Sequence, residues 1–184
     1  MHGLIVNQLR QFVVEAHGRE AWAQINQSAH VALGDRPTMD RIYDDADVTA
    51  VVVAAATLTH TDPQALLEAF GAFLAPTLLR VYAPLIDSRW RTLDIVEHTE
   101  EHIHTAVRLR DPAAGPPYLT ANRLAPDRVV VHYTSPRRLC GVAEGIVRGI
   151  ATRFGEQVTV RQSSCMLRGD AACDIVVTTP APDA

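Results

Sequence analysis

The stretch RVVVHYTSPRRLCGVAEGIVRGI, residues 128–150, joins a predicted strand to a predicted helix. Residues 128–133 are rich in β-branched and aromatic side chains, which favours a strand. Ser135 is a good helix N-cap, and Pro136 suits the position that follows it. The apolar residues beyond them recur at helical spacing: Leu139, Val142, Ile146, Val147 and Ile150. This helix is expected to end near Gly155.

The sequence on either side of this stretch predicts strands after residue 117 and helices before it. The further strands are expected at 118–124, 157–167 and 173–178, and the helices at 3–17, 19–29, 44–58, 61–76 and 88–110. The pattern indicates an α+β fold, in which a helical N-terminal half packs on a C-terminal antiparallel sheet with one inserted helix. We expect a single domain over 1–184, with an N-terminal helical subdomain at about 1–60, a pocket subdomain at 61–178 and a flexible tail at 179–184.

The composition excludes several kinds of chemistry. The chain has 184 residues, and all 17 basic residues are arginine, so no lysine is present to form a Schiff base or a Walker A phosphate contact. A net charge of −4 makes a nucleic-acid surface unexpected. The N-terminus lacks a signal-peptide pattern, and no apolar run approaches the roughly 20 residues of a membrane span. We therefore expect a cytoplasmic protein with neither a membrane nor a nucleic-acid partner.

Three histidines lie close together in IVEHTEEHIH, residues 95–104. His98 and His102 are four residues apart, so they share one face of a helix and could bind one metal ion. The zinc-protease pattern H-E-x-x-H is not met, because Thr99 follows the first histidine. A metal-dependent enzyme is therefore a weak interpretation of this segment.

His104 has a different position on the same helix. At about 100° per residue, an apolar stripe forms along one face: Leu93, Val96, Ile103 and Val107. His104 lies at the edge of this stripe, whereas His98 and His102 face the opposite side. His104 is thus either a ligand that points into the protein or a buried core histidine. Glu100 also falls within the stripe, and the pattern gives no reason for an acid there.

The tract Tyr133-x-Ser135-x-Arg137 resembles the Tyr-x-Ser-x-Arg motif of H-NOX domains. These are haem-based nitric oxide sensors related to the haem domain of soluble guanylate cyclase. The resemblance implies that the three residues bind the haem propionates. On physical grounds, an arginine fork can bind a carboxylate bidentately, and the two hydroxyls add donors. The alternative is that Tyr133 packs in the core, Ser135 only caps a helix and Arg137 is solvated.

Other features support the same resemblance. His104 lies 29 residues before Tyr133, which matches the family's proximal haem ligand, and Pro117 matches the proline that presses on the haem. Residues 1–5 resemble the family's N-terminus. The resemblance therefore implies a five-coordinate ferrous haem b whose iron is ligated by His104.

The resemblance also implies which residues surround the gas-binding face of the haem: Ile5, Leu9, Leu74 and Val142. Some family members carry a tyrosine at the position of Val142, and its hydroxyl stabilises dioxygen. This chain lacks that donor, so we expect it to bind nitric oxide and carbon monoxide but to form no stable dioxygen complex.

Signalling is expected to follow the family pattern as well. Nitric oxide would weaken the bond between iron and His104, and the proximal helix would relax. We expect no enzymatic activity in the chain itself. A separate partner, a histidine kinase or a cyclic-di-GMP enzyme, would read the change.

Cys140, Cys165 and Cys173 form a second candidate site. Several bacterial H-NOX proteins hold zinc in this region with three cysteines and a histidine, but Gln162 stands at the histidine position here. Three interpretations stay open: zinc with water or another fourth ligand, a redox-sensing thiol cluster, or three buried free cysteines. The hairpin between the last two cysteines also resembles the ligand-binding domains named after vinyl reductase, so a non-haem regulatory domain for a small ligand, thiol chemistry or zinc is the alternative function.

Overall fold

Three helices form the first half of the chain in the computed structural model, which describes residues 1–180. They are α1 (Gly3–Ser28), α2 (Asp45–Thr59) and α3 (Pro63–Val81). Asp44 and Asp62 cap α2 and α3, because their carboxylates accept hydrogen bonds from first-turn N–H groups. Gly18, with φ 84° and ψ 169°, breaks the regular geometry of α1. The prediction of two helices in this region is therefore confirmed, and glycine is suited to the break because it lacks a Cβ.

The next helical stretch contains three segments in direct succession. They are α4 (Thr92–His98), the π-helical turn η2 (Thr99–His104) and α5 (Thr105–Arg110). The backbone N–H of Thr105 donates to the carbonyl of Glu100, five residues earlier, which is the wide hydrogen-bond spacing of a π-helix. The predicted helix at 88–110 thus begins later, at Thr92, and contains a π turn that helical periodicity did not indicate.

A four-stranded antiparallel sheet forms the second half. Its strands are β1 (Tyr118–Ala125), β2 (Arg128–Thr134), β3 (Thr159–Ser164) and β4 (Cys173–Thr178), in the spatial order β1-β2-β4-β3. Helix α6 (Cys140–Phe154) lies between β2 and β3 in sequence. The predicted α+β fold with one inserted helix is confirmed. The described residues also form short 3₁₀ turns: η1 (Ala83–Leu85), η3 (Pro112–Ala114) and η4 (Met166–Arg168).

Helix α6 begins four residues later than Ser135 as N-cap and Pro136 as first helical residue predict. Ser135 caps a turn instead, because its Oγ accepts a hydrogen bond from the backbone N–H of Arg137 at 3.2 Å. Arg138 has φ 52°, in the left-handed region, so a helix cannot run through it. The first turn of α6 starts at Cys140.

Helices α3 and α6 pack with their backbones in contact. A Cβ atom at Gly145 would lie 2.0 Å from the carbonyl oxygen of Glu68, and one at Gly71 would lie 2.2 Å from that of Val142. Only glycine permits this approach. The predicted end of α3 near Pro76 is wrong, since the helix continues through this proline to Val81.

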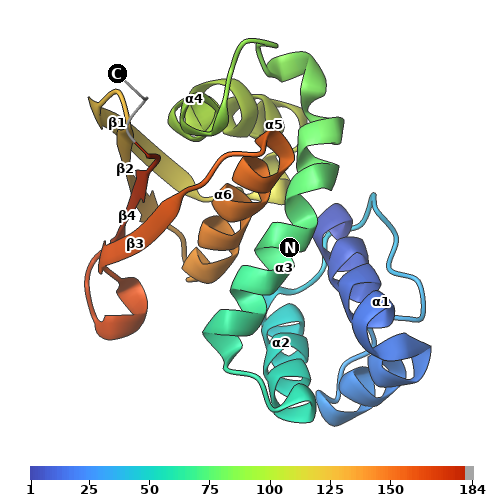
Figure 1. Ribbon diagram of the computed structural model, residues 1–184. Coiled ribbons are helices and arrows are strands. Elements are labelled where there is room, and N and C mark those ends of the chain that lie inside the picture. The colour runs from blue at the N-terminus through green and yellow to red at the C-terminus, as the bar shows by residue number, and fades with distance from the viewer. Residues whose placement is uncertain (181–184) are drawn as a thin grey trace.

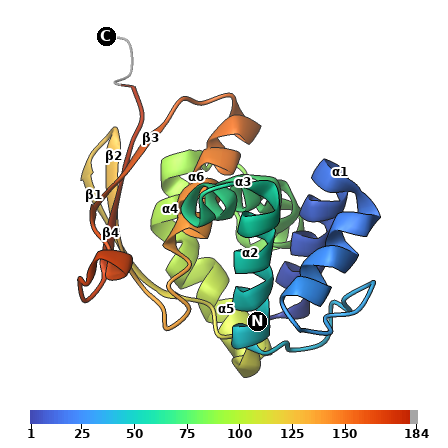
Figure 2. The same cartoon turned by 90° about the horizontal axis from the view of Figure 1, so that it is seen from below.

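The helices and the sheet form successive layers. Figure 1 shows α3 and α6 between the sheet and the pair α1 and α2, and Figure 2 shows the same order from below. One apolar core lies among α1, α2 and α3. A second core lies between α4, α6 and the inner face of the sheet, to which alternate residues such as Val129, Val131 and Ile175 contribute. The space between the two cores holds the candidate site.

Helix α3 is long and apolar enough, by length and composition, to cross a membrane. Its contacts with α6 and its share of the cavity wall account for this apolar character.

The predicted flexible tail at 179–184 begins at Thr179, whose N–H donates to the carbonyl of Asp127 at 2.9 Å. Residues 181–184 of that tail lie outside the described residues.

Candidate functional site: a cavity between the helices and the sheet

A cavity of about 1050 Å³ lies between the N-terminal helices and the sheet-bearing half. The residues that α1, α3 and α6 contribute to its wall are all apolar. All nine cavity residues singled out in the sequence line it: Ile5, Leu9, Leu74, His104, Pro117, Tyr133, Ser135, Arg137 and Val142. The fold therefore gathers at one place residues that are far apart in the chain.

His104, the last residue of η2, lies on the cavity wall, as does His2 near the N-terminus. Its side chain is only 15% exposed, and its Nδ1 lies 3.1 Å from Oε2 of Glu100. Burial lowers the pKa of His104, although the Glu100 carboxylate acts in the opposite direction. The neutral imidazole is thus favoured, and this is the form that binds a metal ion.

His98 and His102 lie outside the cavity wall and gather with Trp90. The ring of Trp90 stacks on His98 with 4.7 Å between the ring centroids and meets His102 edge-on at 5.0 Å. Their ring nitrogens and a carboxylate oxygen of Glu101 lie within 4.8 Å of one another. The shared helix face predicted for the two histidines is present, and it is directed away from the cavity.

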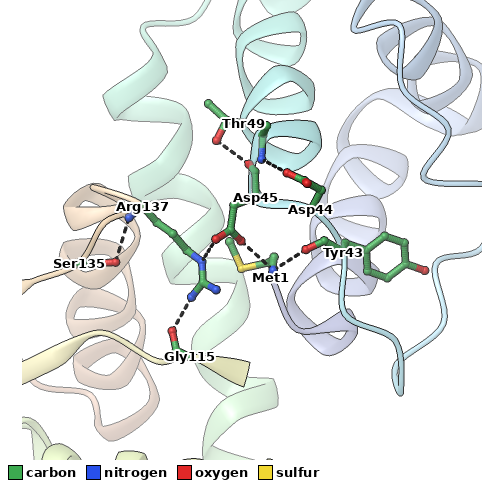
Figure 3. A network of polar contacts seen from close by, with 9 residues as sticks. Met1, Tyr43, Asp44, Asp45, Thr49, Gly115, Ser135 and Arg137 are labelled. Carbon is green, nitrogen blue, oxygen red and sulfur yellow. Dashed lines mark hydrogen bonds and ion pairs between the residues drawn. The ribbon is translucent and has the colours of Figure 1, made fainter. Parts of the chain in front are cut away.

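Arg137 lines the cavity, and Figure 3 shows its guanidinium beside Asp45 and Gly115. Its Nε lies 2.8 Å from Oδ2 of Asp45, and its guanidinium also donates to the carbonyl of Gly115. The buried Nε–H is not aligned for a hydrogen bond with any described acceptor, so the contact with Asp45 is an ion pair. The Arg137 side chain is therefore partly buried and paired, which differs from the solvated alternative.

Asp45 receives a second cation from the start of the chain. The Met1 amino group donates to Oδ1 of Asp45 at 2.7 Å. Burial by itself would raise the pKa of Asp45, but Arg137 and the amino group outweigh it and lower that pKa. Asp45, the first residue of α2, thus connects the chain start and the turn before α6 at the cavity wall.

Tyr133 and Ser135 lie beside Arg137 on the same wall. Tyr133 is only 3% exposed, and burial raises its pKa to about 12, so the phenol remains a neutral hydrogen-bond donor. The hydroxyl of Ser135 already accepts the N–H of Arg137 and keeps its own proton to donate. Two hydroxyl donors and a guanidinium therefore lie close together on the wall of a mainly apolar cavity.

Sequence reasoning did not identify Asp45 as part of the site. The acid appears in the sequence only as a residue at a helix start, where acids are common. Its partner Arg137 is far away in the chain and on a different element, so no local pattern links the two. Glu100, left unexplained by the apolar stripe, is the second residue whose contacts only the structure reveals.

The three cysteines converge in the core where the start of α6 meets the sheet. The sulfur atoms of Cys140, Cys165 and Cys173 lie within 4.8 Å of one another, and all three residues are buried. The Gln162 side chain reaches the Cys140 thiol, and its Nε2 is buried without a partner among the described residues. Burial raises the pKa of Cys173 to about 12, while backbone N–H groups near Leu167 lower that of Cys165 in spite of its burial.

The sequence and the fold of this chain are similar to those of known proteins. The family model described as Haem-NO-binding matches residues 2–162. An H-NOX protein from S. oneidensis in the Fe(II)NO ligation state is 24% identical, with a TM-score of 0.89 over 98% of this chain and 100% of that one. The Fe(II) unliganded H-NOX protein from K. algicida is 16% identical, with a TM-score of 0.89 over 100% of this chain and 99% of that one.

Curated proteins give a similar result at the level of sequence. Soluble guanylate cyclase gcy-35 from Caenorhabditis elegans is 26% identical over 163 residues, which cover 84% of this chain and 23% of that protein. The chain therefore spans less than a quarter of the length of this relative.

Proposed function

Because this chain belongs to the Haem-NO-binding (H-NOX) family of haem-binding gas sensor domains, we propose that it senses nitric oxide and carbon monoxide through a haem b held by His104. The observation that carries this proposal is the largely buried imidazole of His104 on the wall of a large cavity to which α1, α3 and α6 contribute only apolar residues. A bound ferrous haem would supply the open coordination position at which a diatomic gas binds.

The residues of the cavity fit such a group. A haem is a large apolar ring with two carboxylates at one edge, and this cavity is mainly apolar with the donors Tyr133, Ser135 and Arg137 close together on its wall. Arg137 has a buried Nε–H with no aligned hydrogen-bond acceptor, which a propionate could satisfy. The neutral imidazole of His104 suits iron. Tyr133 and Ser135 would add hydroxyl donors to the propionates, and Pro117 would contact the ring.

The apolar cavity residues of α1, α3 and α6 support the proposed choice of gas. The residues of α1, α3 and α6 that line the cavity, including Ile5, Leu9, Leu74 and Val142, carry no hydrogen-bond donor on their side chains. Dioxygen gains partial negative charge when it binds and needs a donor, whereas nitric oxide and carbon monoxide need one much less. These apolar side chains therefore favour the latter two gases.

The proposal extends to signalling and place in the cell. The chain would act as a sensor without catalytic activity, in the cytoplasm, and pass the signal to a histidine kinase or a cyclic-di-GMP enzyme. Its net charge of −4 supports the expectation that nucleic acid is not a partner.

Absorption spectra of the purified chain test this function directly. Protein produced in haem-replete cells is expected to show a Soret band, and the ferrous form should shift it with nitric oxide and with carbon monoxide. In air, no stable dioxygen spectrum is expected. A colourless protein would contradict the proposal and favour a non-haem ligand in the same cavity.

We also propose that the three cysteines hold zinc. The sulfurs of Cys140 and Cys165 lie 3.8 Å apart, which is about the edge of a tetrahedron whose metal–sulfur bonds are ~2.3 Å long. Gln162 stands where a fourth ligand would be needed, and an amide is a poor zinc ligand. The site would therefore hold zinc through three thiolates and lose it readily.

Substituting Gln162→His is expected to strengthen this site, because imidazole completes a closed set of four zinc ligands. Zinc per chain after treatment with a chelator should rise towards one in the variant and stay below that in the unaltered protein. Ser163→His, on the exposed neighbouring position of β3, is the matched control and should retain no additional zinc. Equal zinc loss from Q162H and S163H would contradict a metal site and favour a thiol cluster.

A further inference from the structure

Glu100 lies behind His104, on the side of the imidazole away from the cavity. Its Oε2 is 3.1 Å from Nδ1 of His104 and accepts the backbone N–H of Leu119 at 3.1 Å. Its Oε1 forms an ion pair with Arg108. The carboxylate is thus held by donors from η2, α5 and β1. These contacts explain why an acid occupies the apolar stripe of this helix.

The carboxylate determines which nitrogen of His104 carries the proton. A carboxylate only accepts hydrogen bonds, so Nδ1 must be the protonated nitrogen and Nε2 keeps its lone pair. The carbonyl of Pro117 also faces the His104 ring, but it is a neutral acceptor. A charged acceptor forms the stronger hydrogen bond. Glu100 therefore polarises the imidazole more than a backbone carbonyl would.

Arg108 acts on Glu100 from the opposite side. Its guanidinium pairs with Oε1 of Glu100 and lies over the ring of Tyr118, 4.8 Å from the centroid. A cation at this position draws negative charge away from Oε2 and weakens its pull on the Nδ1 proton. The three side chains contact one another in series. Glu100 makes the Nε2 lone pair of His104 a stronger electron-pair donor to a metal, and Arg108 weakens that effect.

We propose that Glu100 is a positioning residue that makes His104 a stronger ligand to the haem iron, and that Arg108 limits this strengthening. A partner that accepts the proton of a metal-bound imidazole raises the basicity of the ligand. A more basic ligand favours the ferric state and strengthens the iron–histidine bond. This inference rests on the proposed function, because it requires iron at His104.

Glu100→Gln and Arg108→Gln test the inference with opposite expected signs. In the haem-loaded protein, E100Q should raise the reduction potential and lower the iron–histidine stretching frequency in resonance Raman spectra. R108Q leaves the carboxylate without its cation, so it should lower the potential and raise that frequency. Glu101→Gln removes the same charge from a neighbouring side chain that is 79% exposed, and it should leave both quantities unchanged.

A purely structural role would give a different result. If Glu100 and Arg108 only stabilised the helix, the two variants would shift both quantities in the same direction or leave them unchanged, and either outcome overturns the inference. If E100Q fails to fold, R108Q decides alone, because a potential that does not fall contradicts the proposal. An unaltered chain that takes up no haem would instead overturn the proposed function, so the two failures are distinguishable.

Discussion

Substituting His104→Ala is expected to lower the affinity of the protein for haem at least on the order of 100-fold, because the loss of an outer partner of a metal ligand already costs about 10- to 100-fold. The imidazole of His104 lies on the cavity wall, and burial lowers its pKa, which favours the neutral form that binds iron. The measurement is the height of the Soret band at a fixed haem supply. Added imidazole should restore part of the band, since it can enter the space that the side chain leaves.

Two histidines of the same helix provide the control for this experiment. His98→Ala and His102→Ala remove side chains that pack with Trp90 outside the cavity. Both variants should keep the Soret band of the unaltered protein. If H98A or H102A lost the band while H104A kept it, His104 would not be the ligand and the proposed site would be wrong.

Part of this arrangement could be predicted from the sequence because it depends on local periodicity. The apolar stripe from Leu93 to Val107 set the angle at which His104 meets the protein interior. The π turn that contains His104 did not change this direction enough to move the side chain out of the cavity wall. The strands and the helix of the second half were likewise predicted from side-chain type and turn residues, apart from their ends.

The remaining parts depend on contacts that no local pattern encodes. Ser135 and Pro136 have the propensities of a helix start, yet the left-handed φ of Arg138 delays α6 to Cys140. The ion pair between Arg137 and Asp45 joins different elements, and it exists only once α2 is placed beside the cavity. An acid at a helix start carries no information about a partner so far along the chain.

Substituting Val142→Tyr is expected to slow dioxygen dissociation by roughly ten- to hundredfold, because a hydrogen bond to a charged acceptor contributes about 1.5–3 kcal/mol. Val142 lines the cavity from α6, where the neighbouring wall residues are also apolar. A tyrosine there would place a hydroxyl among side chains that offer no donor. The measurement is the dioxygen dissociation rate of the ferrous protein, followed by rapid mixing with an excess of a reagent that consumes free dioxygen.

Val142→Phe separates the hydroxyl from the size of the ring. It adds the same aromatic bulk without a donor, so it should leave dioxygen dissociation as fast as in the unaltered protein. Carbon monoxide dissociation should change little between the two variants, because this gas gains less charge and needs the donor less. Equal slowing of dioxygen by V142Y and V142F would mean that the apolar walls act by restricting the space around the gas. Slowing by V142Y alone would mean that the missing hydrogen-bond donor at this position is what excludes dioxygen.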